Sequence, residues 1–172
     1  NDGGRVAALR AGDVDIIDQV PGNDLQRMLN DPAVSIAQIQ GLRVVYIAFD
    51  YVSESAPAGV TDAQGKPLGG NPFRDVRVRR ALSIGFSRQA IADRVMSGTA
   101  APNGQWLPPG TFGYNPDVQP PQLDVEGAKK LLAEALPHGL KLTLFTPNDR
   151  WANDAQTAQA IAQYWTRLGV IT

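Results

Sequence analysis

Residues 42–49 read Leu-Arg-Val-Val-Tyr-Ile-Ala-Phe, and five of these eight residues are β-branched or aromatic. Such residues favour the extended, pleated conformation of a strand. The segment is apolar on both of its faces, a pattern typical of a strand that is covered on two sides. The sequence therefore predicts a central strand here, in a sheet with further strands beside it.

Helical periodicity surrounds this segment. Leu131 and Leu132 follow Ala128 at helical spacing, and Ile161 and Trp165 share one face of a later segment. Because helices and strands alternate along the chain, the predicted fold class is α/β or mixed α+β, with a mixed sheet flanked by helices. The predicted helices are 5–11, about 23–30 capped by Asn23, one capped by Asp75, one capped by Ser87 and ending at Gly98, one capped by Asp124, and about 153–168; the further predicted strands are 14–17 and 140–145.

Two long loops interrupt the pattern. Residues 57–72 contain three prolines and four glycines and are predicted to be an exposed loop. Residues 99–122 contain six prolines, together with the aromatic residues Trp106, Phe112 and Tyr114. Long loops inside compact domains are usually functional. The aromatic residues of this loop therefore either cover the core or line a ligand site.

Composition excludes several classes of protein. The 172 residues carry a net charge of -1, which does not suit a sequence-independent nucleic-acid binder. The chain has no cysteine and one histidine, so thiol nucleophiles, iron–sulfur clusters and multi-histidine metal sites are excluded, and no cofactor is expected. No stretch is long and apolar enough for a membrane span, and no signal peptide is present. The length suits a single domain.

Catalytic constellations are scarce. His138 lies between Pro137 and Gly139, where a surface turn is the simpler interpretation, and no nucleophile elbow accompanies it. A hydrolase that uses the carboxylates of Asp149 and Asp154 is one alternative function. A protein-interaction module that uses an arginine-rich helix with Arg77 and Arg80 is another, although a solvated helix face explains the same arginines.

Five stretches, in order along nearly the whole chain, resemble the extracellular solute-binding proteins of ABC importers of the peptide, dipeptide and nickel class. The most specific is 71–82, Asn-Pro-Phe-Arg-Asp-Val-Arg-Val-Arg-Arg-Ala-Leu, which is similar to the family's Pro-Phe-x-Asp-x-Arg-Val-Arg-x-Ala-Leu signature. The other four are 5–15, Gly-Thr-Ala-Ala-Pro at 98–102, Ala-Lys-Lys-Leu-Leu at 128–132, and the closing helix that leads into Leu-Gly-Val at 168–170.

Two departures from the family pattern stand out. The family usually has Ala-Ile-Asp-Arg where this chain has Gly-Phe-Ser-Arg at 85–88, and Ser87 is still able to cap the following helix. The central strand usually ends in Phe-Asn and here ends in Phe49 and Asp50. If this position faces the cleft, the change from an amide to a carboxylate alters ligand preference.

The resemblance implies a two-lobed clamshell, of which residues 1–172 are most of the second lobe and a monomeric fragment. It implies that the whole protein is periplasmic or extracellular, possibly lipid-anchored, and that it captures a peptide or similar solute for an ABC permease without catalysis. The acid that pairs with a peptide's ammonium group is expected beyond Thr172. Because the site is shared between lobes, this part alone is expected to bind weakly. The residues expected to face the cleft are Tyr46, Phe49, Asp50, Gln105 and Trp106, with core packing as the alternative for Tyr46 and Phe49.

Overall fold

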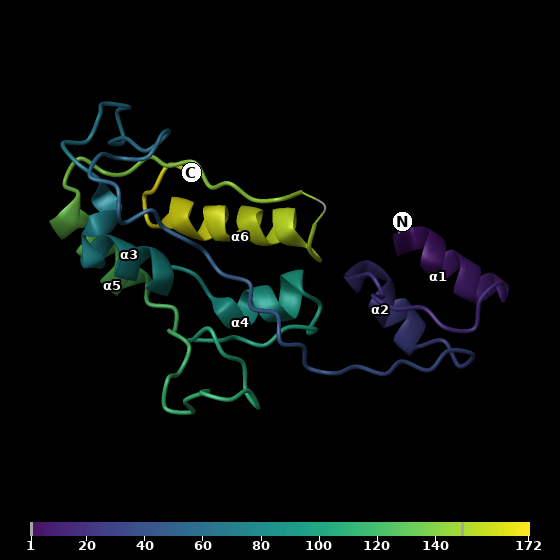
Figure 1. Ribbon diagram of the computed structural model, residues 1–172. Coiled ribbons are helices and arrows are strands. Elements are labelled where there is room, and N and C mark those ends of the chain that lie inside the picture. The colour runs from purple at the N-terminus through teal and green to yellow at the C-terminus, as the bar shows by residue number, and fades with distance from the viewer. Residues whose placement is uncertain (1, 149) are drawn as a thin grey trace.

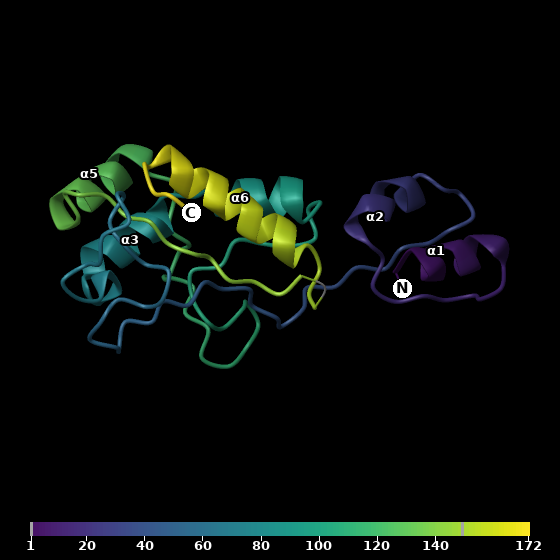
Figure 2. The same ribbon diagram turned by 90° about the horizontal axis from the view of Figure 1, so that it is seen from above.

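The computed structural model describes residues 2–148 and 150–172 and divides them into two parts (Figures 1 and 2). Helices α1 (Asp2–Ala11) and α2 (Gly22–Leu29) lie at one end of the molecule. We call residues 2–31 the α1–α2 module. An extended segment, residues 32–49, joins the module to the remaining helices, which we call the body (residues 50–172).

Four helices of the body begin where a side chain caps them, whereas η2 and α6 have no side-chain cap from a described residue. The short helix η1 (Pro72–Arg74) follows Asn71, and α3 (Val76–Ile84) follows Asp75; in each case the side chain of the preceding residue accepts a backbone N–H. Ser87 caps α4 (Arg88–Ala90), which continues as a π-helical turn, η2 (Ile91–Val95). Asp124 caps α5 (Val125–Ala135), and α6 (Asp154–Arg167) closes the chain.

The core of the body lies where α3, α5 and α6 meet. Trp165 on α6 is 1% exposed, and its indole Nε1–H donates to the carbonyl oxygen of Leu82 on α3 at 2.9 Å. This bond satisfies the polar atom of a large buried ring, as the interior of a protein requires. The other buried apolar residues of this core are Val60, Phe73, Val78, Ala81, Phe86, Ile91, Ala128, Leu132, Leu140, Leu142, Ile161, Leu168 and Val170.

The predicted sheet is not confirmed. Among the described residues, strand pairing is limited to isolated bridges, an antiparallel one between Thr61 and Lys141 and a parallel one between Lys141 and Ile171. Segments 14–17 and 42–49 are not strands, and 140–145 contributes only the bridge residue. The backbone of 35–49 makes no hydrogen bond to another described residue, so this segment is extended without a neighbouring strand.

Over residues 46–49 the side chains nevertheless alternate as they do in a strand. Ile47 and Phe49 pack against the core, whereas Tyr46 and Ala48 are exposed. Alternation of this kind follows from an extended backbone, in which successive side chains point to opposite sides. In the part of the chain that the structure describes, the segment has no second strand beside it to accept its backbone hydrogen bonds. The pattern of side chains within one segment does not predict whether such a strand is present.

Several local predictions are confirmed and others corrected. Asp75, Ser87 and Asp124 cap helices as predicted. The second helix begins earlier than predicted, since α2 starts at Gly22 directly after Pro21, and the side chain of Asn23 lies outside the described residues. The helix predicted to run from Ser87 to Gly98 is shorter and ends in the π-helical turn η2. The expectation that 1–172 form one lobe stays a prediction.

The two predicted loops contain no regular element but differ in character. In 57–72, Val60 and Asp62 are buried and Thr61 pairs with Lys141, so the centre of this loop packs against the body. Residues 99–122 form a projecting loop stabilised by turns, as Figure 1 shows below the body. Among the described residues, no helix is both long and apolar enough to cross a membrane.

Candidate functional site

Two of the predicted cleft residues lie against each other. The rings of Tyr46 and Trp106 are 4.4 Å apart between centroids and meet edge to face at 65°. Tyr46 is 61% exposed and Trp106 is 67% exposed. An edge-to-face pair is a favourable aromatic contact, yet most of both rings faces solvent. The extended segment and the 99–122 loop therefore build one exposed aromatic surface.

Gln105 stabilises the loop that carries this surface. Its Nε2 donates to the carbonyl oxygen of Asn115 at 2.7 Å, and its Oε1 accepts the backbone N–H of the same residue at 3.0 Å. Both ends of the side-chain amide are thus used within the loop. The amide of Gln105 therefore stabilises the loop that carries Trp106.

Phe49 and Asp50 are placed differently from Tyr46. The ring of Phe49 lies 5.2 Å from that of Phe73 and 6.5 Å from that of Trp165, so it packs on the core side of the segment. Asp50 is exposed, and its carboxylate accepts hydrogen bonds from the Ser53 hydroxyl at 2.7 Å and from the backbone N–H groups of Val52 and Ser53. The Ser53 side chain, with these N–H groups, holds the pKa of Asp50 below its usual value.

A second cluster of side chains was not predicted from the sequence. The guanidinium of Arg43 lies over the ring of Trp151, with its Cζ 4.3 Å from the ring centroid. The Cζ of Arg150 lies 5.1 Å from the same centroid. Neither arginine forms an ion pair with another described residue. Two cations beside an aromatic ring, with no ion-pair partner among the described residues, suit the binding of an anion.

The two clusters lie along one segment. Arg43 and Tyr46 are three residues apart on extended backbone, which places their Cα atoms about 10 Å from each other. This segment runs from the module to the body (Figure 1). Arg150 and Trp151 are adjacent in the sequence, but the contact of Trp151 with Arg43, 108 positions earlier, could not be predicted from it.

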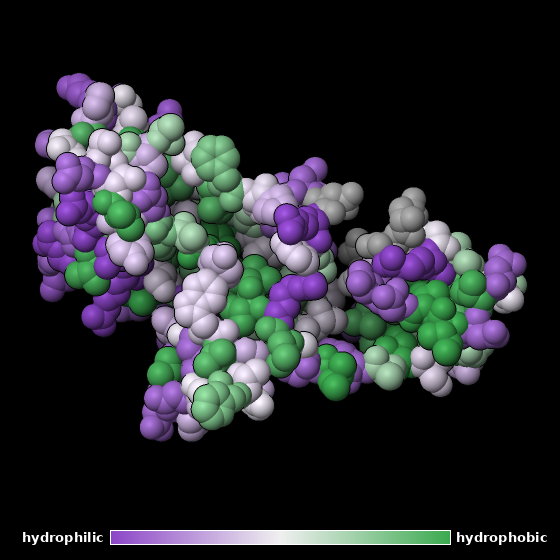
Figure 3. All heavy atoms as spheres, in the orientation of Figure 1, coloured by the Kyte–Doolittle hydropathy of each residue, from purple (hydrophilic) through white to green (hydrophobic). Residues whose placement is uncertain are grey.

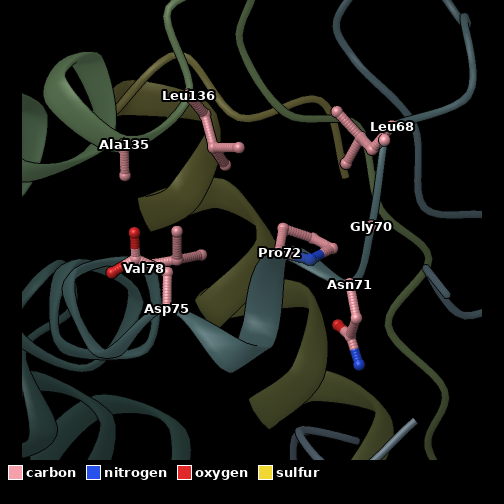
Figure 4. Close-up of a pocket in the computed structure, with 9 residues that line it drawn as sticks. Leu68, Gly70, Asn71, Pro72, Asp75, Val78, Ala135 and Leu136 are labelled. Atoms are coloured by element: carbon pink, nitrogen blue, oxygen red, sulfur yellow. The ribbon is translucent and has the colours of Figure 1, made fainter. Parts of the chain in front are cut away.

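A separate cavity of about 250 Å³ lies beside the signature segment (Figure 4). The Asp75 carboxylate on its wall already accepts bonds from Arg77, and the Asn71 amide donates to the carbonyl oxygens of Asp50 and Ser53. With these polar groups engaged, the cavity has little left to bind a ligand. It is lined by Leu68, Gly69, Gly70, Asn71, Pro72, Asp75, Val78, Ala135 and Leu136.

The alternative sites gain no support from the geometry. Asp149 lies outside the described residues. The carboxylate of Asp154 accepts backbone N–H groups of Arg150, Trp151 and Ala155 and so shapes the turn before α6. Arg77 and Arg80 are both exposed on α3, and Arg77 forms an ion pair with Asp75 at the start of that helix. The described residues include no group of three or more His, Cys, Asp or Glu side chains able to hold a metal ion.

Comparison with known families decides the affiliation. A family model described as bacterial extracellular solute-binding proteins, family 5 Middle, matches residues 1–172. The chain belongs to this family. This confirms the resemblance that the signature segment indicated.

Relatives within the family carry different solutes in their names. The heme-binding protein A of Haemophilus influenzae is 34% identical over 172 residues, and the dipeptide-binding protein of Escherichia coli is 30% identical over 175. The chain spans 28% and 29% of their lengths. Among solved structures, HbpA2 from Haemophilus parasuis matches 99% of this chain and 31% of its own, with 29% identity and a TM-score of 0.66. The chain therefore has part of the periplasmic binding protein fold.

Proposed function

We propose that the chain contributes one wall of the solute site in the substrate-binding component of an ABC importer. The single observation that carries this proposal is the exposed surface along residues 43–46, with the Tyr46–Trp106 pair and the Arg43–Trp151–Arg150 cluster. Family membership supports the role. On this proposal the protein binds a solute, releases it unchanged to a membrane permease, and catalyses no reaction.

The side chains of this surface favour a small solute with a carboxylate and an apolar part. A guanidinium binds a carboxylate through paired N–H donors, and exposed rings of tyrosine and tryptophan offer apolar area with few rotamers to immobilise. A peptide has both features, since its terminal carboxylate is joined to side chains of varied polarity. Heme, named for one relative, also combines a flat apolar ring with carboxylates.

The remaining features of the whole protein are proposed from the family. We place it in the periplasm or outside the cell, in keeping with a relative named as periplasmic, either free or held by a lipid anchor. We propose that 42–49 joins a mixed sheet flanked by helices, formed with strands from beyond residues 1–172. Two lobes then close over the solute, and residues 1–172 include most of the second.

The test requires the longer protein that contains this chain. Small molecules that co-purify with it are extracted and identified by mass spectrometry, and binding of the identified solute is measured by calorimetry. Arg43→Ala and Trp106→Ala are each expected to weaken binding about tenfold or more, the loss of roughly 1.4 kcal/mol. Arg94→Ala is the matched control, because Arg94 is an exposed arginine on η2 and makes no cation–π contact with a described aromatic ring.

The same binding measurements can contradict the proposal. If Arg43→Ala and Trp106→Ala bind the solute as tightly as Arg94→Ala does, the surface along 43–46 is not a wall of the site. Turnover of the bound solute by the purified protein would contradict the statement that no bond is made or broken.

A further inference from the structure

The α1–α2 module touches the body at a narrow junction. Figures 1 and 2 show the module standing apart from the other helices. Its buried apolar side chains are Val6, Leu25 and Met28. The segment that leads from it has no backbone hydrogen bond over 35–49 to hold a fixed direction. The position of the module relative to the body therefore depends on side-chain contacts between the two.

Gly22, the first residue of α2, makes such a contact. A Cβ added at Gly22 would lie 3.1 Å from the Oγ of Ser97 and 3.4 Å from the Nδ2 of Asn153. The first distance is tight for a Cβ and the second is close to ordinary van der Waals contact, so a side chain at this position would require the Ser97 hydroxyl to move by a few tenths of an ångström. Ser97 follows the π-helical turn η2 and Asn153 precedes α6, so the module touches the body where two of its helices end and begin.

Both body residues at this junction have an unusual backbone. Ser97 has a φ of 53° and Asn153 a φ of 54°, in the left-handed region that side chains other than glycine rarely adopt. Such conformations persist where surrounding contacts impose them, and they cluster at functional positions. Here the Asn153 Nδ2 donates to the carbonyl oxygen of Val95 at 2.8 Å, which ties the start of α6 to the end of η2.

We propose that Ser97 and Asn153 form a docking seat for Gly22, and that seating of α2 there sets the distance between the module and the body. Asn153 is held to the body by its bond to Val95, whereas the joining segment has no backbone hydrogen bond to a described residue over 35–49. Asn153 is two residues after Trp151, so the docked module lies beside the cluster of Arg43 and Trp151. The contact between Gly22 and the seat would then close next to the surface that binds the solute. This consequence rests on the proposed function.

The seat is tested by distance measurement between two spin labels. The chain has no cysteine, so Gln26→Cys on α2 and Gln163→Cys on α6, both exposed, give two unique attachment points. Pulsed electron spin resonance on the full chain without solute is expected to give one narrow distance distribution. With Gly22→Leu the distribution is expected to broaden and its main peak to move to longer distance. Gly22→Ala is expected to shift the peak in the same direction by less.

Gly3→Leu is the matched control, because Gly3 is also in the first turn of a helix and a Cβ there would meet no atom within 4 Å. Its distribution is expected to equal that of the parent chain. Asn153→Gly keeps the left-handed backbone without strain but removes the amide, and is expected to broaden the peak.

Circular dichroism shows whether each variant keeps its helices. If Gly22→Leu loses them, the distance distribution of Gly22→Ala is the test of the seat. Equal distributions for Gly22→Ala, Gly22→Leu and Gly3→Leu would overturn the seat. Because no solute is present, failure of the proposed function leaves this result unchanged, and the reverse also holds.

Discussion

The body and the α1–α2 module bury very different amounts of apolar surface. In the body, side chains from η1, α3, α5 and α6 form one continuous core around Trp165. The module buries Val6, Leu25 and Met28 and exposes Ile16 and Leu29; Figure 3 shows apolar side chains on its visible face. A unit of about 30 residues rarely supports its own core. We infer that the body is stable through its own core, whereas the module needs contact with another part of the protein to be stable.

The largest expected effect comes from the centre of the body's core. Trp165→Ala removes a buried ring and leaves the carbonyl oxygen of Leu82 without its indole partner. Substitutions of this kind cost about 3–5 kcal/mol. Urea denaturation followed by circular dichroism is expected to show this loss in the free energy of unfolding of the body.

Met28→Ala is the counterpart in the module. It should leave the body's unfolding midpoint unchanged, because Met28 is buried among the module's own residues and not in the body's core. A common midpoint shift for Met28→Ala and Trp165→Ala would show that module and body unfold as one unit, and would break the contrast.

A smaller loss is expected from Gly85→Ala. A Cβ at Gly85 would lie 2.9 Å from the carbonyl oxygen of Ala81 and would collide with the side chain of Leu168. Overpacking of this kind costs about 1–3 kcal/mol. Thermal unfolding measures it, with Gly3→Ala in the module as the control, where a new Cβ meets nothing within 4 Å. Equal melting temperatures for both variants would contradict the close packing between α3 and α6.

The helix cap at Asp75 provides a test that also depends on pH. Asp75→Ala removes the acceptor for the Arg77 N–H and should cost about 1 kcal/mol, whereas Asp75→Asn retains an acceptor. The hydrogen bond from the Arg77 side chain lowers the pKa of Asp75. The stabilisation is therefore complete above the ordinary aspartate value of about 3.9 and is lost as pH falls through the lower folded value.

The measurement is the difference in free energy of unfolding between the parent chain and Asp75→Ala at a series of pH values. The difference is expected to shrink toward acid pH. A difference that grows on acidification would reverse the sign and refute the role of the charged carboxylate.

The smallest effect is expected at Asp50, next to the joining segment. Its carboxylate is bonded to Ser53 and Val52 and its pKa is lowered, so the turn is held at neutral pH and released as pH falls through the folded pKa. NMR is expected to show the Ser53 amide titrating with a midpoint below about 3.9. Asp50→Asn should abolish that titration while the unfolding midpoint of the body stays the same. A titration that persists in Asp50→Asn would assign it to another group.

Local signals predicted the helices well, and non-local contacts account for what was missed. The caps at Asp75, Ser87 and Asp124 depend on hydrogen bonds to residues two or three positions away. They could therefore be predicted from the neighbouring residues in the sequence. The strand prediction for 42–49 recognised an extended segment but not the lack of a partner, since pairing depends on residues far along the chain.

The candidate site shows the same division. Tyr46 and Trp106 were named separately, and their contact across 60 positions became visible only in the structure. Arg43 over Trp151 had no local signal at all, because a cation next to an aromatic ring is a tertiary contact. Gln105 was named as a cleft residue, yet its amide is bonded within the loop, a role set by Asn115 ten residues later.

Hydrogen exchange of the backbone amides tests most directly the claim that the body is self-supporting while the joining segment lacks partners. The account predicts slow exchange in α3 and α6, and exchange close to that of an unfolded chain over 42–49, because amides without a hydrogen bond are not protected. It predicts intermediate rates in α1 and α2. Protection over 42–49 equal to that of α3 in the chain alone would contradict it.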